Sequence, residues 1–322
     1  MQFEEINKGY NNVFQFGKLS IGVVVPIENY GQNPIPTMKH HIERVQLIER
    51  LGFRALWVRD VPFHVPSFGD AGQTFDPFAY LGYLAAGTSN IALGVASIAL
   101  PLHHPLHVAK SATTIDQLSD GRLILGIASG DRFDEYPAMN FNHQKRGEAF
   151  RQSYEYIRKV QENYPVLKNN AFGELQGHIE VLPKAAGHKI PMLVTGFSQQ
   201  SLEWNAEFGD GWMYYPRNLL QQQYTIAEWR EMIPQNYSKP FMQPLYIDLQ
   251  EDDDFKPQPI HLGFKIGANY LVEYFQQLEE IGVNHVALNL RFNTHKIEDT
   301  LERLAEKVLP KFHSEKTIKI TQ

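Results

Sequence analysis

The chain has 322 residues, no cysteine and a formal net charge of −6. The lack of cysteine excludes disulfides, thiolate metal ligands and a cysteine nucleophile, and the mild acidity gives no indication of a nucleic-acid partner. With 43% hydrophobic residues the chain can bury a large core, and its length fits two domains or one α/β barrel of ~250 residues with insertions.

The first 17 residues are polar and charged, without the apolar centre of a signal peptide. No run reaches the ~18 consecutive apolar residues that a membrane span needs. We therefore expect a cytoplasmic protein that does not enter a membrane.

Strand and helix patterns alternate along the chain. The predicted strands cover residues 19–25, 55–58, 91–98, 123–128, 190–194, 211–214, 245–249 and 285–290. The predicted helices cover residues 37–51, 77–88, 105–118, 146–160, 198–208, 219–232, 268–281 and 297–308. This alternation predicts a parallel sheet, and eight such units predict a closed (β/α)8 TIM barrel. A doubly wound sheet with extra helices is the alternative.

Two helix starts carry capping signals, from Thr37 and from Asp76, which is followed by Pro77 at the first helical position. There is no internal repeat and no linker, so we expect a single TIM-barrel domain over residues 1–322. Residues 169–186 have weak hairpin character and are predicted to be an insertion. That insertion and the long loop 61–76 are candidate lids, because long loops without secondary structure are often functional.

The predicted strand 123–128 is followed by Ser129-Gly130-Asp131-Arg132. These residues lie where a parallel strand opens at its carboxyl end, which is where ligands bind in α/β folds. Gly130 permits close approach of a ligand, and Ser129 or Arg132 is suited to hold a phosphate. A strand-to-loop turn with a surface ion pair is the alternative.

The next predicted strand leads into Thr195-Gly196-Phe197-Ser198-Gln199-Gln200-Ser201. A glycine followed by hydroxyl groups in the first turn of a helix is typical of a phosphate site, because free N–H groups and the positive end of the helix dipole meet there. Ser198 and Ser201 are three residues apart and share one helix face. The alternative is that Ser198 only caps the helix.

Arg59 and Asp60 end the second predicted strand. Charged groups at that place are positioned for chemistry, but they also commonly pair with neighbours. We favour pairing for Asp60 and leave Arg59 open.

Three histidines, at positions 103, 104 and 107, invite interpretation as a metal site. Their spacing suits neither a helical pair nor one face of a strand, and no nearby carboxylate completes a site, so we expect no metal. Trp212, Tyr214 and Tyr215 lie at the end of the sixth strand, where they line a pocket for a flat ring or belong to the core.

Four sequence blocks resemble those of the bacterial luciferase-like flavin-dependent monooxygenases, over roughly residues 19–215. The blocks are Ile91-Ala92-Leu93-Gly94 through Leu100-Pro101 and His104-Pro105; Asp116-Gln117-Leu118-Ser119-Asp120-Gly121-Arg122; Leu125-Gly126-Ile127-Ala128-Ser129-Gly130; and Thr195-Gly196-Phe197-Ser198 with Ser201, Glu203 and Trp204. Their order and spacing match as well. The chain is more similar to the broad luciferase-type oxidoreductase branch than to luciferase itself.

The resemblance implies an eight-stranded barrel that binds flavin mononucleotide (FMN) at its carboxyl face. Matching the blocks places the phosphate against the cofactor-binding residues Thr195, Gly196, Phe197, Ser198 and Ser201, with help from Ser129 and Arg132.

The resemblance also implies that the flavin ring lies over the third strand, where the family has a non-prolyl cis peptide. That bond is expected at Val95–Ala96. Trp57, Arg59 and Ser97 are expected to border the ring.

Two departures from luciferase concern the catalytic groups. Val61 stands where luciferases have a histidine after the second strand, and Ala128 stands at the position of their reactive cysteine. Light emission is therefore not expected, and no catalytic acid or base is carried over. Arg59 and the neighbouring His64 are the remaining catalytic candidates.

The resemblance implies an oxidoreductase that uses reduced FMN and O2 to insert one oxygen atom into a small organic substrate. A separate reductase would supply the reduced flavin, because no nicotinamide-binding G-x-G-x-x-G unit follows a strand. A homodimer is expected. The alternatives are a deazaflavin-dependent hydride-transfer enzyme on the same barrel and a flavin-binding protein without turnover.

Overall fold

The computed structural model describes residues 2–31, 33–69, 71–234 and 238–313. In this part of the chain eight parallel strands close into a barrel in the order β12–β1–β2–β3–β4–β7–β8–β9, and β9 pairs with both β8 and β12. The strands are β1 (Ser20–Val24), β2 (Ala55–Val58), β3 (Ala92–Ala99), β4 (Leu123–Ala128), β7 (Met192–Thr195), β8 (Gly211–Met213), β9 (Phe241–Leu249) and β12 (His285–Asn289). The predicted TIM barrel is thus confirmed.

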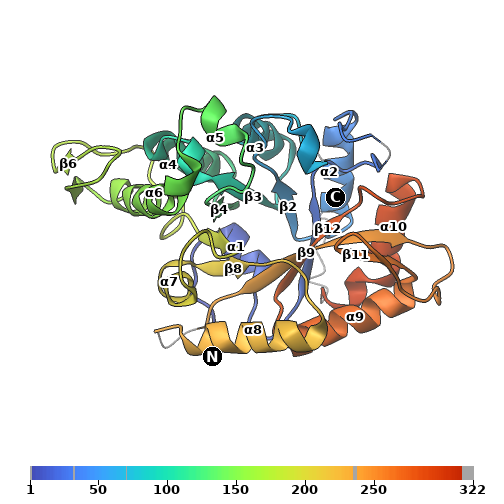
Figure 1. Cartoon of the computed structure of the whole chain (residues 1–322). Coiled ribbons are helices and arrows are strands. Elements are labelled where there is room, and N and C mark those ends of the chain that lie inside the picture. Colours follow the sequence, from blue (N-terminus) through green and yellow to red (C-terminus); the bar gives the residue numbers. More distant parts are fainter. Residues whose placement is uncertain (1, 32, 70, 235–237, 314–322) are drawn as a thin grey trace, which may run out of the picture.

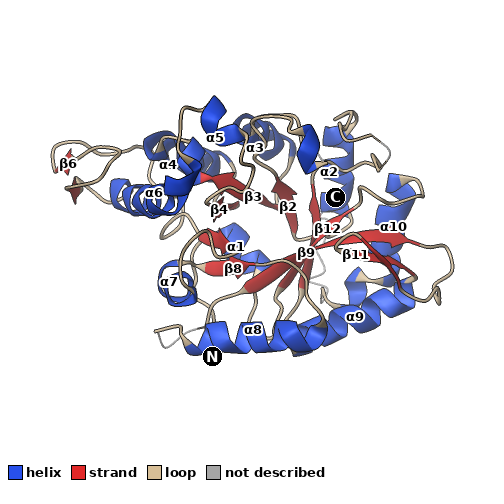
Figure 2. Ribbon diagram, in the orientation of Figure 1, coloured by secondary structure: helices blue, strands red, loops and turns tan. Residues whose placement is uncertain are grey.

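A helix follows each barrel strand and covers the outside of the barrel (Figure 2). The helices are α2 (His41–Arg50), α3 (Pro77–Gly87), α4 (Pro105–Leu118), α6 (Arg146–Val160), α7 (Leu202–Phe208), α8 (Leu219–Glu231), α9 (Ala268–Glu280) and α10 (Ile297–Lys307). Short 3-10 turns occur at Pro66–Phe68, Leu100–Leu102, His143–Lys145 and Leu309–Lys311. Within the described ranges no helix has the length and apolar character to cross a membrane.

Two predicted helix starts are wrong. The helix predicted from Thr37 begins at His41, because Glu28 accepts the Thr37 hydroxyl (2.6 Å) and backbone N–H (2.5 Å) and holds them outside the helix. The helix predicted from Ser198 begins at Leu202. Ser198 and Gln199 have φ angles of 48° and 60°, in the left-handed region where a right-handed helix cannot continue. The predicted cap at Asp76 is confirmed, since its carboxylate accepts from the N–H of Ala79.

The apolar core has two layers because neighbouring strand residues face opposite ways. In β3, Leu93 and Val95 pack outward under the helices, whereas Ala92 joins a cluster inside the barrel with Trp57 and Met213. This arrangement makes the barrel interior a packed core rather than a pore.

The N-terminal segment closes the amino end of the barrel, which the sequence did not reveal. Helix α1 (Lys8–Val13) is bonded to residues at the starts of two strands. The hydroxyl of Tyr10 donates to the carbonyl of Asp210, which directly precedes β8, and the hydroxyl of Ser20, the first residue of β1, donates to the carbonyl of Val13. The buried ring of Phe14 packs inside the barrel with the same inner cluster. The open end of the barrel is therefore the carboxyl end.

Three smaller pieces complete the chain. β5 (Val166–Leu167) and β6 (Leu175–Gln176) pair as a hairpin that projects beside α4 and α6, at the left of Figure 1, so the predicted insertion has the expected hairpin but starts a few residues earlier. β10 (Gln258–Ile260) and β11 (Gly263–Ile266) extend β9 beyond the barrel. Helix α5 (Glu135–Ala138) lies in the loop after β4.

Candidate functional site

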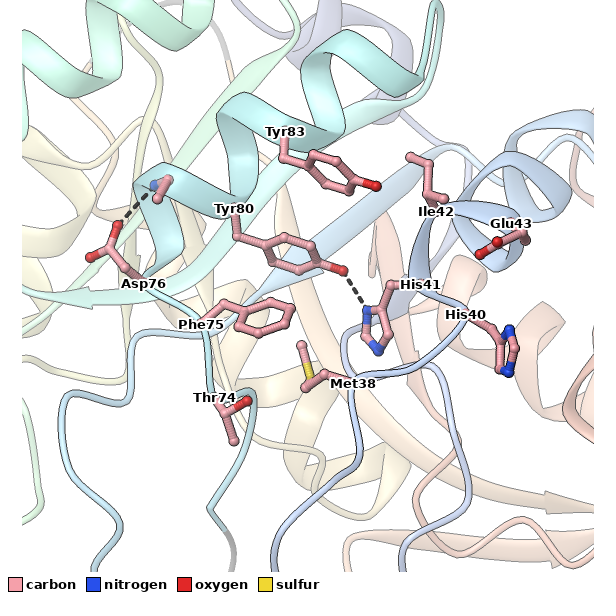
Figure 3. Close-up of a pocket in the computed structure, with 11 residues that line it drawn as sticks. Met38, His40, His41, Ile42, Glu43, Thr74, Phe75, Asp76, Tyr80 and Tyr83 are labelled. Carbon is pink, nitrogen blue, oxygen red and sulfur yellow. Dashed lines mark hydrogen bonds between the residues drawn. The ribbon is translucent and has the colours of Figure 1, made fainter.

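One cavity, of about 730 Å³, lies outside the barrel between α2 and α3. It is lined by aromatic side chains, among them Phe75, Tyr80 and Tyr83, and His41 and the hydroxyl of Tyr80 form a hydrogen bond in its wall (Figure 3). Burial lowers the pKa of His41 to about 4, so its ring is neutral. None of the predicted site residues lines this cavity, whose walls come from the starts of α2 and α3 and from the loops that precede them.

A second pocket, of about 390 Å³, lies at the carboxyl ends of the barrel strands. Its walls come from the ends of β2, β3, β4 and β7 and from the loop after β8. Nine predicted residues line it together: Arg59, Ala96, Ser97, Ser129, Arg132, Thr195, Gly196, Phe197 and Ser198. The candidate site is therefore this pocket.

Hydroxyl groups gather on one wall of the pocket. The side chain of Ser198 donates to the carbonyl of Thr195 at 2.7 Å, and the hydroxyls of Thr195 and Ser97 are hydrogen-bonded to each other. Gly196 has a φ of 55°, and a Cβ built there would meet nothing within 4 Å. The β7 loop thus presents hydroxyl groups beside open space.

Besides Arg59, two further guanidinium groups line the same pocket. Arg132 is 93% buried and its Cζ lies 4.4 Å from the centre of the Phe68 ring, in a cation–π contact with the loop after β2. Arg146 donates to the carbonyl of His143 at 3.0 Å, whereas its Nε is buried without a hydrogen-bond partner. This positive charge is suited to an anion such as a phosphate.

The ends of β3 and β4 also line the pocket with small side chains, those of Ala96, Ala99 and Ala128. The non-prolyl cis peptide joins Ala96 to Ser97, so the position expected from the resemblance, Val95–Ala96, is wrong by one residue. The β3–β4 pairing register shifts between Val95 and Ile98, and Val95 belongs to the outer core layer. Val95 therefore does not line the pocket, whereas Ala96 and Ser97 do.

Three other predicted residues lie outside the pocket. Trp57 is fully buried inside the barrel, where its indole N–H donates to Nε2 of His285 at 2.8 Å. His64 is exposed on the loop after β2. Ser201 is the N-cap of α7 and accepts from the N–H of Trp204 at 3.2 Å. The structure therefore places none of these three residues in the pocket wall.

Asp60 pairs with neighbours, as favoured from the sequence, and it also lines the pocket. Its Oδ2 accepts from the N–H of Ala99 at 3.0 Å and lies 2.8 Å from Nε2 of His103. Burial lowers the pKa of His103, but the hydrogen bond and charge of Asp60 outweigh that effect and raise it overall. In the described residues no three His, Cys, Asp or Glu side chains are grouped as metal ligands.

Sequence reasoning missed Glu135, whose side chain is 3% exposed and lines the pocket. Burial raises the pKa of its carboxyl group to about 7. In the sequence Glu135 follows Asp134 in a polar stretch typical of a surface turn. The one signal for a functional role is its closeness in sequence to the motif that follows β4. Of the aromatic residues in and after β8, Tyr215 lines the pocket and Trp212 belongs to the core.

A model of one protein family, described as luciferase-like monooxygenase, matches residues 19–241. The chain belongs to the luciferase-like monooxygenase family. The family assignment supports an oxidoreductase.

Sequence relatives agree with the family assignment. An uncharacterized protein of Mycobacterium tuberculosis is 31% identical, over 59% of this chain and 75% of that protein. The alkanal monooxygenase beta chain of Photorhabdus luminescens is 29% identical, over 52% of this chain and 50% of its own length.

Solved structures share the fold at low identity. A monooxygenase, RslO1, from Streptomyces bottropensis has a TM-score of 0.76 at 19% identity, covering 91% of this chain and 100% of its own. An F420-dependent secondary alcohol dehydrogenase, in complex with an F420–acetone adduct, has a TM-score of 0.74 at 17% identity, covering 92% and 99%. Luciferase-like folds of this kind therefore include both monooxygenases and F420-dependent enzymes.

Proposed function

We propose that this protein is an FMN-dependent monooxygenase of the luciferase-like family that acts on a small organic substrate. The observation that carries the proposal is the carboxyl-end pocket, which is lined by hydroxyl groups, guanidinium groups and small side chains. In the overall reaction reduced FMN, O2 and substrate give oxidised FMN, the oxygenated substrate and water. The cofactor supplies the oxygen-activating chemistry.

The residues present fit a flavin with a phosphate tail. Ser129, Ser198 and the open backbone at Gly196 would hold the phosphate, with charge from Arg132 and from Arg146, whose buried Nε has no partner. A phosphate would satisfy that donor by a charge-assisted hydrogen bond. Ser201 is left out of this set, because it caps α7 outside the pocket.

The wall of small side chains suits a flat ring system. Ala96, Ala99 and Ala128 have no bulk beyond Cβ, so a planar group can lie close to the backbone of β3 and β4. Phe68, Phe197 and Tyr215 stand around the pocket and would exclude water once it is filled. Arg59 keeps a proposed role beside the reacting groups, because it lines the pocket, whereas the exposed His64 does not.

The same proposal includes two protein partners. A separate reductase would supply reduced FMN, and a second copy of this chain would form a homodimer. Light scattering on the purified protein tests the dimer directly, with a mass of twice the 37.0 kDa chain as the expected result.

A deazaflavin-dependent hydride-transfer enzyme is the second candidate. The structural similarity to an F420-dependent alcohol dehydrogenase favours it, since both proteins share the barrel over nearly their whole lengths. The two candidates differ in the cofactor that binds and in the need for O2.

The test is binding followed by turnover. Apo-protein is titrated with FMN and with F420, each oxidised and reduced, and substrate-dependent oxygen uptake is then measured for a panel of small aldehydes, pyrimidines and aromatic compounds. Reduced FMN binding with substrate-dependent oxygen uptake supports the proposal. Binding of F420 alone supports the hydride-transfer enzyme, and FMN binding without any turnover indicates a flavin-binding protein.

A further inference from the structure

Glu135 is a buried acid that the proposed function does not yet use. It begins α5, four residues that fold over the pocket after β4, and only 3% of its surface is exposed. Its Oε1 is buried without a hydrogen-bond partner, although the residue lines the pocket. A buried carboxyl oxygen with no partner is costly unless a ligand or a proton satisfies it.

Charged groups from several elements surround this carboxyl group. The backbone N–H of Phe63, on the loop after β2, bonds to it, and Arg132 attracts its negative form. Asp60 at the end of β2 and Asp131 after β4 repel that form.

Two further neighbours respond to the charge of Glu135. Its negative form raises the pKa of His103 and also that of Tyr136, which Arg146 lowers. Burial outweighs the attraction of Arg132, so the pKa of Glu135 rises to about 7 and the acid is partly protonated at neutral pH.

We propose that Glu135 is the group through which this pocket exchanges a proton with its ligand. The inference rests on the proposed function, because the ligand that supplies the charge beside Arg132 is the phosphate-bearing flavin or its substrate. The geometry carries it: the unpartnered Oε1 is buried in the pocket wall next to the guanidinium that an anion would approach.

Each proton that Glu135 gives to the ligand is replaced by one from solvent. When an anion binds beside Arg132, it favours the uncharged acid, so Glu135 takes up a proton from solvent. In the following step the carboxyl O–H bond breaks, the proton passes to an oxygen or nitrogen of the ligand, and the carboxylate that remains is protonated again from solvent. A general acid suits a monooxygenase reaction, because the second oxygen atom must be protonated to leave as water.

Other acids in the pocket are less suited to this exchange. Both contacts of Asp60 use its Oδ2, which fixes its carboxylate to Ala99 and His103. Tyr215 is a phenol whose pKa is raised further by burial and by the charge of Asp131, so it holds its proton throughout the neutral range. Asp131 is exposed to solvent.

The test measures FMN affinity from pH 6 to pH 8.5 for the full-length wild type, Glu135→Gln and Glu135→Asp. Glu302→Gln, an exposed carboxylate on α10, is the matched control. The phosphate of FMN titrates near pH 6 in every variant, so the informative quantity is the ratio of wild-type to Glu135→Gln affinity.

Above pH 7 the wild type should lose affinity by up to ~10-fold per pH unit relative to Glu135→Gln, since binding is linked to proton uptake. Glu135→Asp should keep the pH dependence, and Glu302→Gln should match the wild type. A pH indicator in weak buffer should show proton uptake when wild type binds FMN at pH 8. This second measurement uses only the wild-type protein, so it does not depend on whether the variants fold.

Equal pH dependence in wild type and Glu135→Gln, or binding without proton uptake in the wild type, overturns the proposal and leaves the proposed function intact. If no variant binds FMN at any pH while all remain folded, the proposed function fails, and the role of Glu135 fails with it.

Discussion

The indole N–H of Trp57 donates a hydrogen bond to Nε2 of His285 across the inside of the barrel, at 2.8 Å. On the other side of the imidazole, Nδ1 lies 2.6 Å from the hydroxyl of Ser20. Burial lowers the pKa of His285 to about 3, so the ring is neutral and its Nδ1–H donates to Ser20. This chain of hydrogen bonds ties β2, β12 and β1 together below the pocket.

Trp57→Phe should destabilise the protein by ~1–3 kcal/mol, because Nε2 of His285 is then buried without a partner. Trp229→Phe is the matched control, since the Trp229 indole is equally buried but its N–H has no partner to lose. Urea unfolding measures both. If Trp57→Phe lowers the free energy of unfolding no more than Trp229→Phe does, the hydrogen bond to His285 does not stabilise the protein.

The contrast at Trp57 shows what the sequence can and cannot predict. Most barrel strands, and helices such as α4 and α6, were predicted to within two residues at each end because each has a clear apolar pattern, whereas β9 begins four residues before its predicted start. Whether Trp57 lies in the pocket or in the barrel interior depends on its position along β2, because only residues at the carboxyl end of the strand reach the pocket. The indole fits inside only because Gly94 on the next strand has no side chain.

Gly94→Ala should destabilise the barrel by ~3 kcal/mol or more, because a Cβ there would lie 2.3 Å from the Trp57 ring, which is packed on all sides. Gly82→Ala, on helix α3, meets nothing within 4 Å and should stabilise the protein by up to ~1 kcal/mol. Thermal or urea unfolding of the two variants tests whether their effects on stability have opposite signs. Equal effects would contradict the packing described for the inner layer.

Asp210 is a buried acid held by two cations. Burial would raise its pKa, but Arg158 and Lys189 outweigh burial and lower it, and its Oδ1 lies 2.9 Å from Nζ of Lys189. Asp210→Asn should cost ~3–5 kcal/mol, because it leaves Arg158 without its charged partner. Asp120→Asn, in an exposed pair with Lys8, should change little.

The stabilisation by Asp210 should also depend on pH. Since its pKa is lower in the folded state, the stabilisation is present above its ordinary value of 3.8 and is lost as the pH falls below it. Urea unfolding of wild type and Asp210→Asn at several pH values should therefore converge in acid. A difference between the two that stays constant down to pH 2.5 would contradict the assignment.

Glu135 should affect the stability of the ligand-free protein in the opposite direction. Its pKa is raised from 4.5 to about 7 in the folded protein, so the folded state binds the extra proton in that range. Wild type should lose stability relative to Glu135→Gln as the pH rises from about 4.5 to 7, by about 3 kcal/mol at most. A flat difference over that range would show that Glu135 is charged throughout.

The site itself was only partly readable from sequence. Motifs placed nine pocket residues together because they follow neighbouring parallel strands, whose carboxyl ends must meet. Glu135 could not be found this way, since its burial comes from the loop that folds over it. Ser198 and Ser201 were expected on one helix face, but the left-handed backbone at Ser198 sends only Ser198 into the pocket.

The measurement that tests the central claim most directly is a titration of four proteins with reduced FMN: wild type, Ser129→Ala/Ser198→Ala, Ser201→Ala, and Glu302→Gln as an unrelated surface change. If the pocket holds the phosphate, the double variant should bind ~10-fold or more weakly, whereas Ser201→Ala should lose only helix-capping stability and keep wild-type affinity. Tight binding by the double variant, or a loss of affinity in Ser201→Ala alone, would contradict this placement. Absence of FMN binding by the wild type would contradict the proposed function as a whole.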